Sequence, residues 1–400
     1  MKVPAFLIIG AVTLISMLAP FTIDTYLPSF PAIESELAVT SEFMMQSLSV
    51  YLLVFGAATL FWGPLSDRWG RRKIILISLL GYVLGSFICA LTPNFELLMA
   101  GRALQGFFAA GSLVASRAMV RDVFDGDQAQ KAMAVVMMLF AAAPAFAPIL
   151  GGWLEVHYGW RWVFLFLMAY GIVIFLLFVF FIPETLARHH VQSVQLVSVM
   201  KAYWVSIQDP IFARLIVAQG LLIGGFFLYV AGSSSIIFNH LKLFEQDFWM
   251  LFVPVVSFMI VGSSLIHRLT GRVANRKLVD LSLAICFIGI LLNVTLELSL
   301  SVSIYMVVIP LMFYSMGFAM ANPGLMVMGL DCMPERRGMA SSMQSFFQMG
   351  TAGMVTAVIL PYVHHSLLAM AVAQALLFST AGLLWLSVRS KDKDANSSLV

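Results

Sequence analysis

Charged residues are scarce in this sequence. Only 11% of its 400 residues are charged and 61% are hydrophobic, whereas a soluble domain carries about a quarter charged residues. The composition therefore excludes an ordinary soluble protein. An apolar stretch of about 20 residues spans a bilayer as a helix, and such stretches predict an all-α integral membrane protein with about twelve transmembrane helices. They lie at 4–27, 43–63, 74–93, 96–117, 131–153, 161–182, 212–236, 247–267, 279–298, 303–328, 339–360 and 366–388.

Cysteines and metal-binding patterns are also scarce. The three cysteines are scattered along the chain, so they predict neither a disulfide framework nor a metal site. The seven histidines show no metal-ligand spacing, and no lysine follows a glycine, which excludes a phosphate-binding GxxxxGK loop. The sequence also lacks a nucleophile–base constellation. We therefore expect a protein that is not an enzyme and holds no metal or cofactor.

The 23 Lys and Arg residues follow the hydrophobic stretches in a regular way. With Met1 placed in the cytoplasm, 20 of the 23 fall on the cytoplasmic side, and only Arg102, Arg161 and Lys242 do not. Basic residues concentrate in the cytoplasmic loops of membrane proteins, so both termini are expected in the cytoplasm. The net charge of +3 then needs no nucleic-acid partner, because topology accounts for it.

A polar interval divides the apolar stretches into two sets of six. It predicts an N-terminal six-helix half at 1–182, a cytoplasmic central loop at 183–210, a C-terminal six-helix half at 211–390 and a cytoplasmic tail at 391–400. A faint echo links the halves, SDRWGRRK at 66–73 and HRLTGRVANRK at 267–277. Parallel repeats related by an axis along the membrane normal are a known transporter architecture.

The connection GPLSDRWGRRK, at 63–73, combines glycines with a high density of charge. Its glycines permit a sharp turn and close backbone approach, and its aspartate sits among four cations, so we expect an ionised, paired carboxylate. The order of residues is too specific for a loop that only sets topology. The residues concerned are Gly63, Asp67, Arg68, Gly70 and Arg71.

These residues resemble the major facilitator superfamily, which carries this motif between its second and third helices. Leu98, Arg102, Gln105 and Gly106 match the L-x-x-x-R-x-x-Q-G pattern of its drug–proton antiporters. IDTYLPSFP at 23–31 and SRAMVRD at 116–122, with Arg121, resemble the Bcr/CflA exporters of that superfamily, which confer resistance to bicyclomycin and chloramphenicol.

The fifth apolar stretch also resembles these antiporters. APILGG at 147–152 matches their G-P-x-x-G-G motif through Pro148, Gly151 and Gly152, with Ala147 in place of the first glycine. Proline kinks a helix and small residues let helices approach closely. The resemblance implies a hinge and seal between conformational states, and ordinary small-residue packing is the alternative.

Among the charged residues that fall within predicted spans, Asp24 in the first and Arg102 in the fourth lie at similar depths. Both are about 7–11 Å below the outer boundary, counted at about 1.5 Å per residue. Charged groups in a membrane usually face a cavity and pair, so Asp24 is expected to carry a proton and Arg102 to modulate its charge. The alternatives are a static pair that fixes helix packing or, for Asp24 alone, an interface residue or helix cap.

Polar residues in other spans are candidates for the wall of the substrate cavity. In the resembling fold, spans two, four, seven, ten and eleven line that cavity. This selects Tyr51, Gln105, Tyr229, Asn322 and Gln344. The alternative for each of them is an interhelical hydrogen bond.

The resemblance implies two pseudo-symmetric halves of the major facilitator fold that export small amphipathic molecules by alternating access, driven by a proton gradient. It places a monomer in the bacterial inner membrane, with a small-molecule substrate, protons and the lipid bilayer as partners. A dedicated exporter of one natural product, such as a siderophore or metabolite, is the alternative. Uptake by symport is disfavoured by the P-x-x-G-G stretch.

Overall fold

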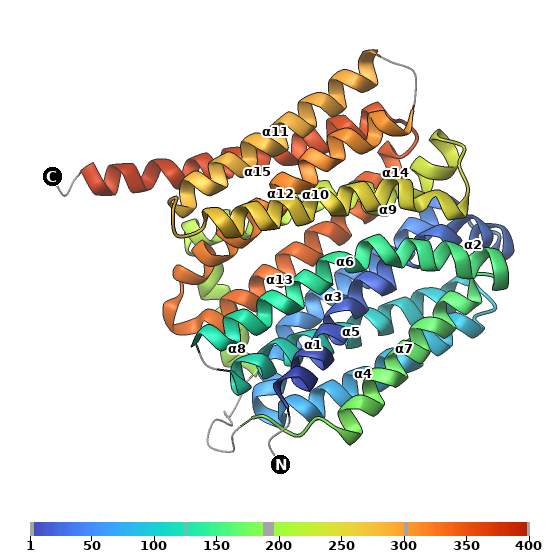
Figure 1. Ribbon diagram of the computed structural model, residues 1–400, viewed down its shortest axis with the longest axis horizontal. Helices are drawn as coiled ribbons and strands as arrows, with labels where there is room; N and C mark the ends of the chain where they lie inside the picture. Colours follow the sequence, from blue (N-terminus) through green and yellow to red (C-terminus); the bar gives the residue numbers. More distant parts are fainter. Residues whose placement is uncertain (1–3, 125, 187–195, 300–302, 398–400) are drawn as a thin grey trace. The chain divides into compact units, whose positions relative to one another are not determined.

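The computed structural model describes residues 4–124, 126–186, 196–299 and 303–397. Twelve helical segments in this part of the chain are long and apolar enough to cross a membrane (Figure 1). This confirms the number predicted from the sequence and makes the chain a multi-pass membrane protein. The spanning helices are α1 (Ala5–Asp24), α3 (Ser41–Trp69), α4 (Arg71–Leu91), α5 (Phe95–Val123), α6 (Gly126–Tyr158), α7 (Arg161–Phe180), α9 (Pro210–Ser234), α10 (Trp249–Leu269), α11 (Asn275–Ser299), α12 (Ile304–Asp331), α13 (Arg337–Met354) and α15 (Leu367–Ser397).

Several short elements were not predicted. A 3₁₀ turn at Leu27–Ser29 and helix α2 (Phe30–Leu37) continue the first span, and α8 (Leu196–Ile207) lies within the predicted central loop. Helix α13 continues through a π-helical segment at Val355–Ile359 into the short helix α14 (Leu360–Val363). Helix α15 extends to Ser397, well into the region predicted as a tail.

The chain forms two compact units. The first contains Met1–Gln195 together with Ile237–Val253, and the second contains Leu196–Ile236 together with Pro254–Val400. The segment Ile237–Val253 follows α9 in the sequence, yet it packs with the first unit, chiefly through its 3₁₀ turn Glu245–Phe248 against α6. The boundary of the central loop at 183–210 stays a prediction.

Helices in the first unit approach one another closely at small residues. Helix α5 packs on both α3 and α4, α7 packs on α4, and α6 packs on α1. Where α4 meets α5, a Cβ added to Gly85 would lie 2.9 Å from the backbone nitrogen of Gln105. This spacing leaves no room for a larger side chain, and it brings the polar residues of four helices into one region.

The second unit is organised around α9, which packs against α12, α13 and α15, and around the contact of α11 with α12. Asn293 of α11 donates to the Tyr229 hydroxyl of α9 at 2.6 Å and to Gln374 Oε1 of α15 at 3.1 Å. Gln374 in turn donates to the carbonyl oxygen of Gly225 at 3.2 Å. All three side chains are buried, so this network ties three helices together where water is excluded.

The close approach of α11 and α12 generates a test of the packing. In Gly317→Ala, the new Cβ would lie 2.5 Å from the carbonyl oxygen of Ser282 and 2.7 Å from the backbone nitrogen of Cys286. Backbone atoms yield little, and overpacking costs about 1–3 kcal/mol. We expect a lower thermal midpoint for purified Gly317→Ala, measured by intrinsic fluorescence.

Gly382→Ala is the matched control, because Gly382 also lies inside a helix but has nothing within 4 Å of an added Cβ. Alanine is favoured over glycine in a helix by about 1 kcal/mol, so its midpoint should be unchanged or higher. Equal midpoints for the two variants would contradict the packing described for α11 and α12.

Candidate functional site

A cluster of polar side chains lies inside the first unit, where α1, α3, α4 and α5 meet. Its centre is Arg102 of α5, which has no solvent-exposed surface. The other members are less than 5% exposed, although every one carries a polar group. They are Thr22 and Asp24 on α1, Tyr26 just after it, Ser47 and Tyr51 on α3, Tyr82 and Ser86 on α4, and Gln105 on α5.

Arg102 is held by aromatic rings and by neutral acceptors. Its guanidinium carbon lies 4.7 Å from the ring centroids of both Tyr26 and Tyr51. Its Nη1 donates to Gln105 Oε1 at 2.9 Å and to the carbonyl oxygen of Thr22 at 3.2 Å, while Nε and Nη2 have no acceptor. A desolvated cation over an aromatic face gains about 2 kcal/mol, so the two rings stabilise much of this charge.

The neighbours of Arg102 are themselves fixed by hydrogen bonds. Gln105 Nε2 donates to Ser86 Oγ at 2.8 Å, which orients its Oε1 toward Arg102. The Tyr26 and Ser47 hydroxyls lie 2.9 Å apart, and the Thr22 and Tyr82 hydroxyls 2.6 Å apart. Gln105 was predicted as a substrate-cavity residue, and the structure gives it a clear part in positioning Arg102.

The carboxyl of Asp24, unlike the guanidinium of Arg102, lacks hydrogen-bond partners among the described residues. Its side chain is 4% exposed and makes no hydrogen bond or ion pair with any residue that the structure describes. The expected direct pair with Arg102 is therefore absent: Arg102 bonds Gln105 and Thr22 through Nη1, and its Nε and Nη2 donate to no described acceptor. Asp24 belongs to the cluster by its place on α1, two residues after Thr22, whose carbonyl oxygen accepts from Arg102. Their predicted roles in proton coupling stay predictions.

Glycines of the two antiporter motifs set the helix spacing around this cluster. A Cβ on Gly106 of α5 would overlap the carbonyl oxygen of Tyr51, and one on Gly151 of α6 would overlap that of Thr25. Gly152 similarly approaches the carbonyl of Glu245. Pro148 lies buried within α6, which continues past it to Tyr158. Gly151 thus brings α6 against α1 one residue beyond Asp24.

The predicted turn between α3 and α4 consists of one residue, Gly70. Its φ is +98°, a conformation that residues with a side chain rarely adopt, and an added Cβ would overlap the Glu184 carboxylate. The expectation that Gly63 also forms the turn is wrong, because α3 continues to Trp69. Gly63 instead accepts a hydrogen bond from Ser66 Oγ at 2.9 Å.

Arg71 is the centre of the charged motif. It pairs with Asp67, as expected for that carboxylate, and its Nε donates to Asp122 Oδ2 at 2.9 Å. Its Nη1 also donates to Ser66 Oγ at 2.7 Å. The motif thereby joins α3, α4 and the last turn of α5.

Glu184, which follows α7, completes the motif. Its carboxylate accepts hydrogen bonds from the backbone nitrogens of Arg71 and Arg72 at 2.9 and 3.1 Å. Glu184 was missed from the sequence. Asp122 was noted only as the last residue of the SRAMVRD motif, and its pairing with Arg71 was not predicted. Arg68 and Arg121 make no ion pair with any residue that the structure describes, and their roles stay predictions.

The candidates in the second unit lie in interhelical hydrogen bonds. Tyr229 belongs to the network with Asn293 and Gln374. Gln219 Nε2 donates to Asn322 Oδ1 at 2.6 Å, joining α9 to α12. Gln344 Nε2 of α13 donates to the carbonyl of Met326 at 3.0 Å. Each of these residues thus forms the interhelical hydrogen bond that was the alternative to a cavity role. A place in the substrate cavity stays a prediction.

The similar loop sequences at 66–73 and 267–277 also share a backbone conformation. Gly271, in the connection between α10 and α11, has a φ of +83°, close to that of Gly70. An added Cβ on Gly271 would meet nothing within 4 Å, whereas Gly70 is covered by Glu184. The loop at Gly271 thus has the same glycine turn as the loop at Gly70, but no carboxylate of a described residue lies against it.

Comparison with known proteins identifies the family of this twelve-helix fold. The model of the major facilitator superfamily matches residues 12–357, and the chain belongs to that superfamily. It is a transporter by family, and the predicted place in the Bcr/CflA drug-antiporter branch is confirmed.

Two curated relatives and one solved structure illustrate the match. A bicyclomycin resistance protein homolog of Haemophilus influenzae is 28% identical over 84% of this chain and 85% of its own length. A chloramphenicol resistance protein of Pseudomonas aeruginosa is 28% identical over 76% of this chain and 72% of its own length. The crystal structure of the human organic anion transporter MFSD10 shares the fold, with a TM-score of 0.74, 17% identity, and coverage of 96% of this chain and 99% of its own.

The charged motif yields a stability prediction for Asp122→Asn. The side chains of Arg71 and Asp122 are only 9% and 21% exposed, and losing a charged partner from such a site costs about 1–3 kcal/mol. The thermal midpoint of the purified protein should therefore fall measurably.

Asp331→Asn provides the comparison, because Asp331 and Arg337 are 60% and 61% exposed and 3.4 Å apart. An exposed pair contributes less than about 1 kcal/mol, so this variant should unfold close to wild type. A shift in Asp331→Asn as large as that in Asp122→Asn would show that burial of the Arg71 pair is not what matters.

Proposed function

We propose that this transporter exports small amphipathic molecules across the bacterial inner membrane in exchange for protons. The observation that carries the proposal is the state of the two charges in the polar cluster. Arg102 is stabilised by Tyr26, Tyr51, Gln105 and a backbone carbonyl, whereas the Asp24 carboxyl has no partner among the described residues. A carboxyl group inside the membrane is costly and usually functional.

Asp24 is the proton carrier in this scheme. A carboxyl that is free of hydrogen bonds gains and loses a proton without first breaking a contact. Arg102 keeps its proton, because a guanidinium is charged at all ordinary pH values. Its fixed charge favours the ionised form of a nearby carboxylate, while burial opposes ionisation. The balance between these effects permits proton exchange during transport.

Helix α1 connects proton exchange to conformational change in this proposal. Gly151 of α6 touches the backbone of Thr25, next to Asp24. A change in the charge of Asp24 alters how favourably the last turn of α1 packs, and α6 lies directly against that turn. The prolines within α6 weaken its backbone hydrogen bonding, which makes α6 the element best suited to respond.

The proposed membrane orientation and the proposed substrates are supported by observations outside the polar cluster. The concentration of Lys and Arg at one end of the spans supports cytoplasmic termini. Relatives named for resistance to bicyclomycin and chloramphenicol support small amphipathic drugs as substrates. A transporter dedicated to one natural product is the alternative outcome of the test below.

The test uses the full-length protein in liposomes with an imposed pH gradient and an internal pH-sensitive dye. Bicyclomycin, chloramphenicol and a panel of amphipathic drugs are added in turn. Wild type should show drug-dependent proton movement, and Asp24→Asn should fall to the leak of protein-free liposomes because the exchangeable carboxyl is gone. Passive drug exchange, measured without a pH gradient, should persist in Asp24→Asn.

Asp331→Asn is the matched control, because it removes an exposed carboxylate that pairs only with Arg337 among the described residues. Its proton movement should match wild type. Drug-dependent proton movement that persists in Asp24→Asn would move the coupling site elsewhere. No proton movement with any drug would contradict drug antiport, and siderophores and metabolites would then form the next panel.

A further inference from the structure

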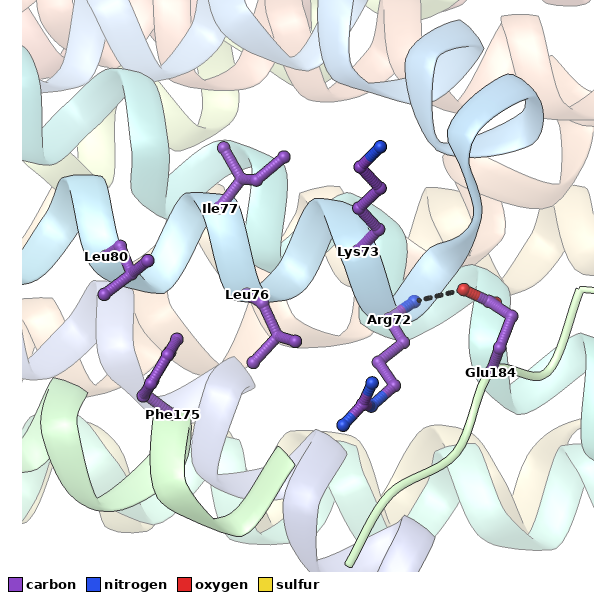
Figure 2. Close-up of a pocket in the computed structure, with 7 residues that line it drawn as sticks. All are labelled: Arg72, Lys73, Leu76, Ile77, Leu80, Phe175 and Glu184. Atoms are coloured by element: carbon purple, nitrogen blue, oxygen red, sulfur yellow. Dashed lines mark hydrogen bonds between the residues drawn. The ribbon is translucent and has the colours of Figure 1, made fainter. Parts of the chain in front are cut away.

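We propose that the first unit binds an anionic phospholipid in a groove between α4 and α7. The groove has a volume of about 460 Å³ and is lined by Arg72, Lys73, Leu76, Ile77, Leu80, Phe175 and Glu184. Figure 2 shows the three charged side chains at one end and Leu80 and Phe175 at the other. The groove lies apart from the Arg102 cluster, and the proposed transport mechanism does not use it.

The charged end carries an excess of unpaired positive charge. Both oxygens of Glu184 accept backbone hydrogen bonds, from Arg71 and Arg72 as well as from Thr185 and Leu186. Four N–H donors and the N-terminus of α4 therefore satisfy this carboxylate. Lys73 is exposed and pairs with no acidic residue in the described ranges, and its ammonium lies 5.9 Å from the Trp69 ring.

Arg72 holds the two walls of the groove together and keeps one donor for a ligand. Its Nε donates to the carbonyl of Phe178 at 3.2 Å and its Nη2 to that of Val179 at 2.8 Å. These are carbonyls of the last turn of α7. Nη1 makes no hydrogen bond with residues that the structure describes. The groove therefore offers Nη1 and the Lys73 ammonium to an anion such as a phosphate group.

An apolar stripe continues the groove along α4. Side chains at intervals of three and four residues share one face of a helix, and here the stripe begins at Lys73. Leu80 and Leu84 are each 53% exposed, and Phe87 and Leu91 continue the stripe with 45% and 60% exposure. Because α4 spans the membrane, acyl chains cover this face. The stripe places those chains directly below the cationic end.

A phospholipid is the one occupant that fits both ends of the site. A hydrophilic anion would meet only the solvent-accessible cations, a contact that contributes less than about 1 kcal/mol, and an apolar molecule would not use the charges. Basic pockets between transmembrane helices bind the head groups of anionic lipids, at about 1 kcal/mol per Lys or Arg near the surface. The single unpaired Lys73 and the free donor of Arg72 match one phosphate.

The experiment is a lipid titration of the delipidated, full-length protein followed by native mass spectrometry. Phosphatidylglycerol and phosphatidylcholine with identical acyl chains are the probes. Wild type should prefer phosphatidylglycerol by about fivefold or more, as one lysine contributes. Lys73→Gln should abolish that preference. Ile77→Trp, which fills the apolar part of the groove, should weaken binding of both lipids. Glycerol phosphate, a head group without chains, should not compete.

Lys277→Gln is the matched control. Lys277 is exposed in the first turn of α11 and ends the corresponding basic loop of the second unit. This variant should bind phosphatidylglycerol as wild type does. Lys73→Gln and Lys277→Gln should keep the wild-type thermal midpoint, because both lysines are exposed. Equal loss in Lys277→Gln and Lys73→Gln would overturn the proposal in favour of general surface charge. Unchanged binding in Lys73→Gln or in Ile77→Trp, or competition by glycerol phosphate, would also overturn it.

Discussion

A positive charge inside the membrane is the constraint on which the first unit depends. Arg102 has no contact with solvent, and an unsatisfied charge there would be very costly. Helices α1, α3 and α5 and the turn after α1 stabilise it through two tyrosine rings, a glutamine and a backbone carbonyl, and Ser86 of α4 orients the glutamine. The groups that hold the arginine are neutral, and the one carboxyl in the cluster makes no hydrogen bond with a described residue. A fixed charge on Arg102 and an unbonded carboxyl on Asp24 together make Asp24 a physically reasonable proton carrier.

The last turn of α1 is where these constraints meet. Within four residues it supplies a carbonyl to Arg102, the free carboxyl of Asp24, and the backbone that Gly151 of α6 touches. The charged loop at Gly70 performs a different task, since Arg71 and Glu184 tie α3, α4, α5 and the segment after α7 together. The polar cluster therefore combines an exchangeable group with a well-fixed frame.

Much of this structure could be predicted from the sequence. Hydrophobic length alone gave the twelve spans, because a bilayer requires about 20 apolar residues per helix. Among the motif glycines, Gly106 and Gly151 lie where backbones touch, and Gly70 lies against the Glu184 carboxylate. The partners of Arg102 could not be predicted, because helix rotation decides whether a tyrosine or a carboxylate faces it. Asp122 and Glu184 reach Arg71 and its neighbour only through packing of distant segments.

We propose that Asp24 exchanges a proton while Arg102 stays charged. Infrared difference spectroscopy of the purified protein during a pH change measures this directly, because a protonated carboxyl has a carbonyl band that a carboxylate lacks. We expect a reversible band that is missing in Asp24→Asn and shifts when Arg102 is replaced by glutamine. An identical spectrum in wild type and Asp24→Asn would contradict it.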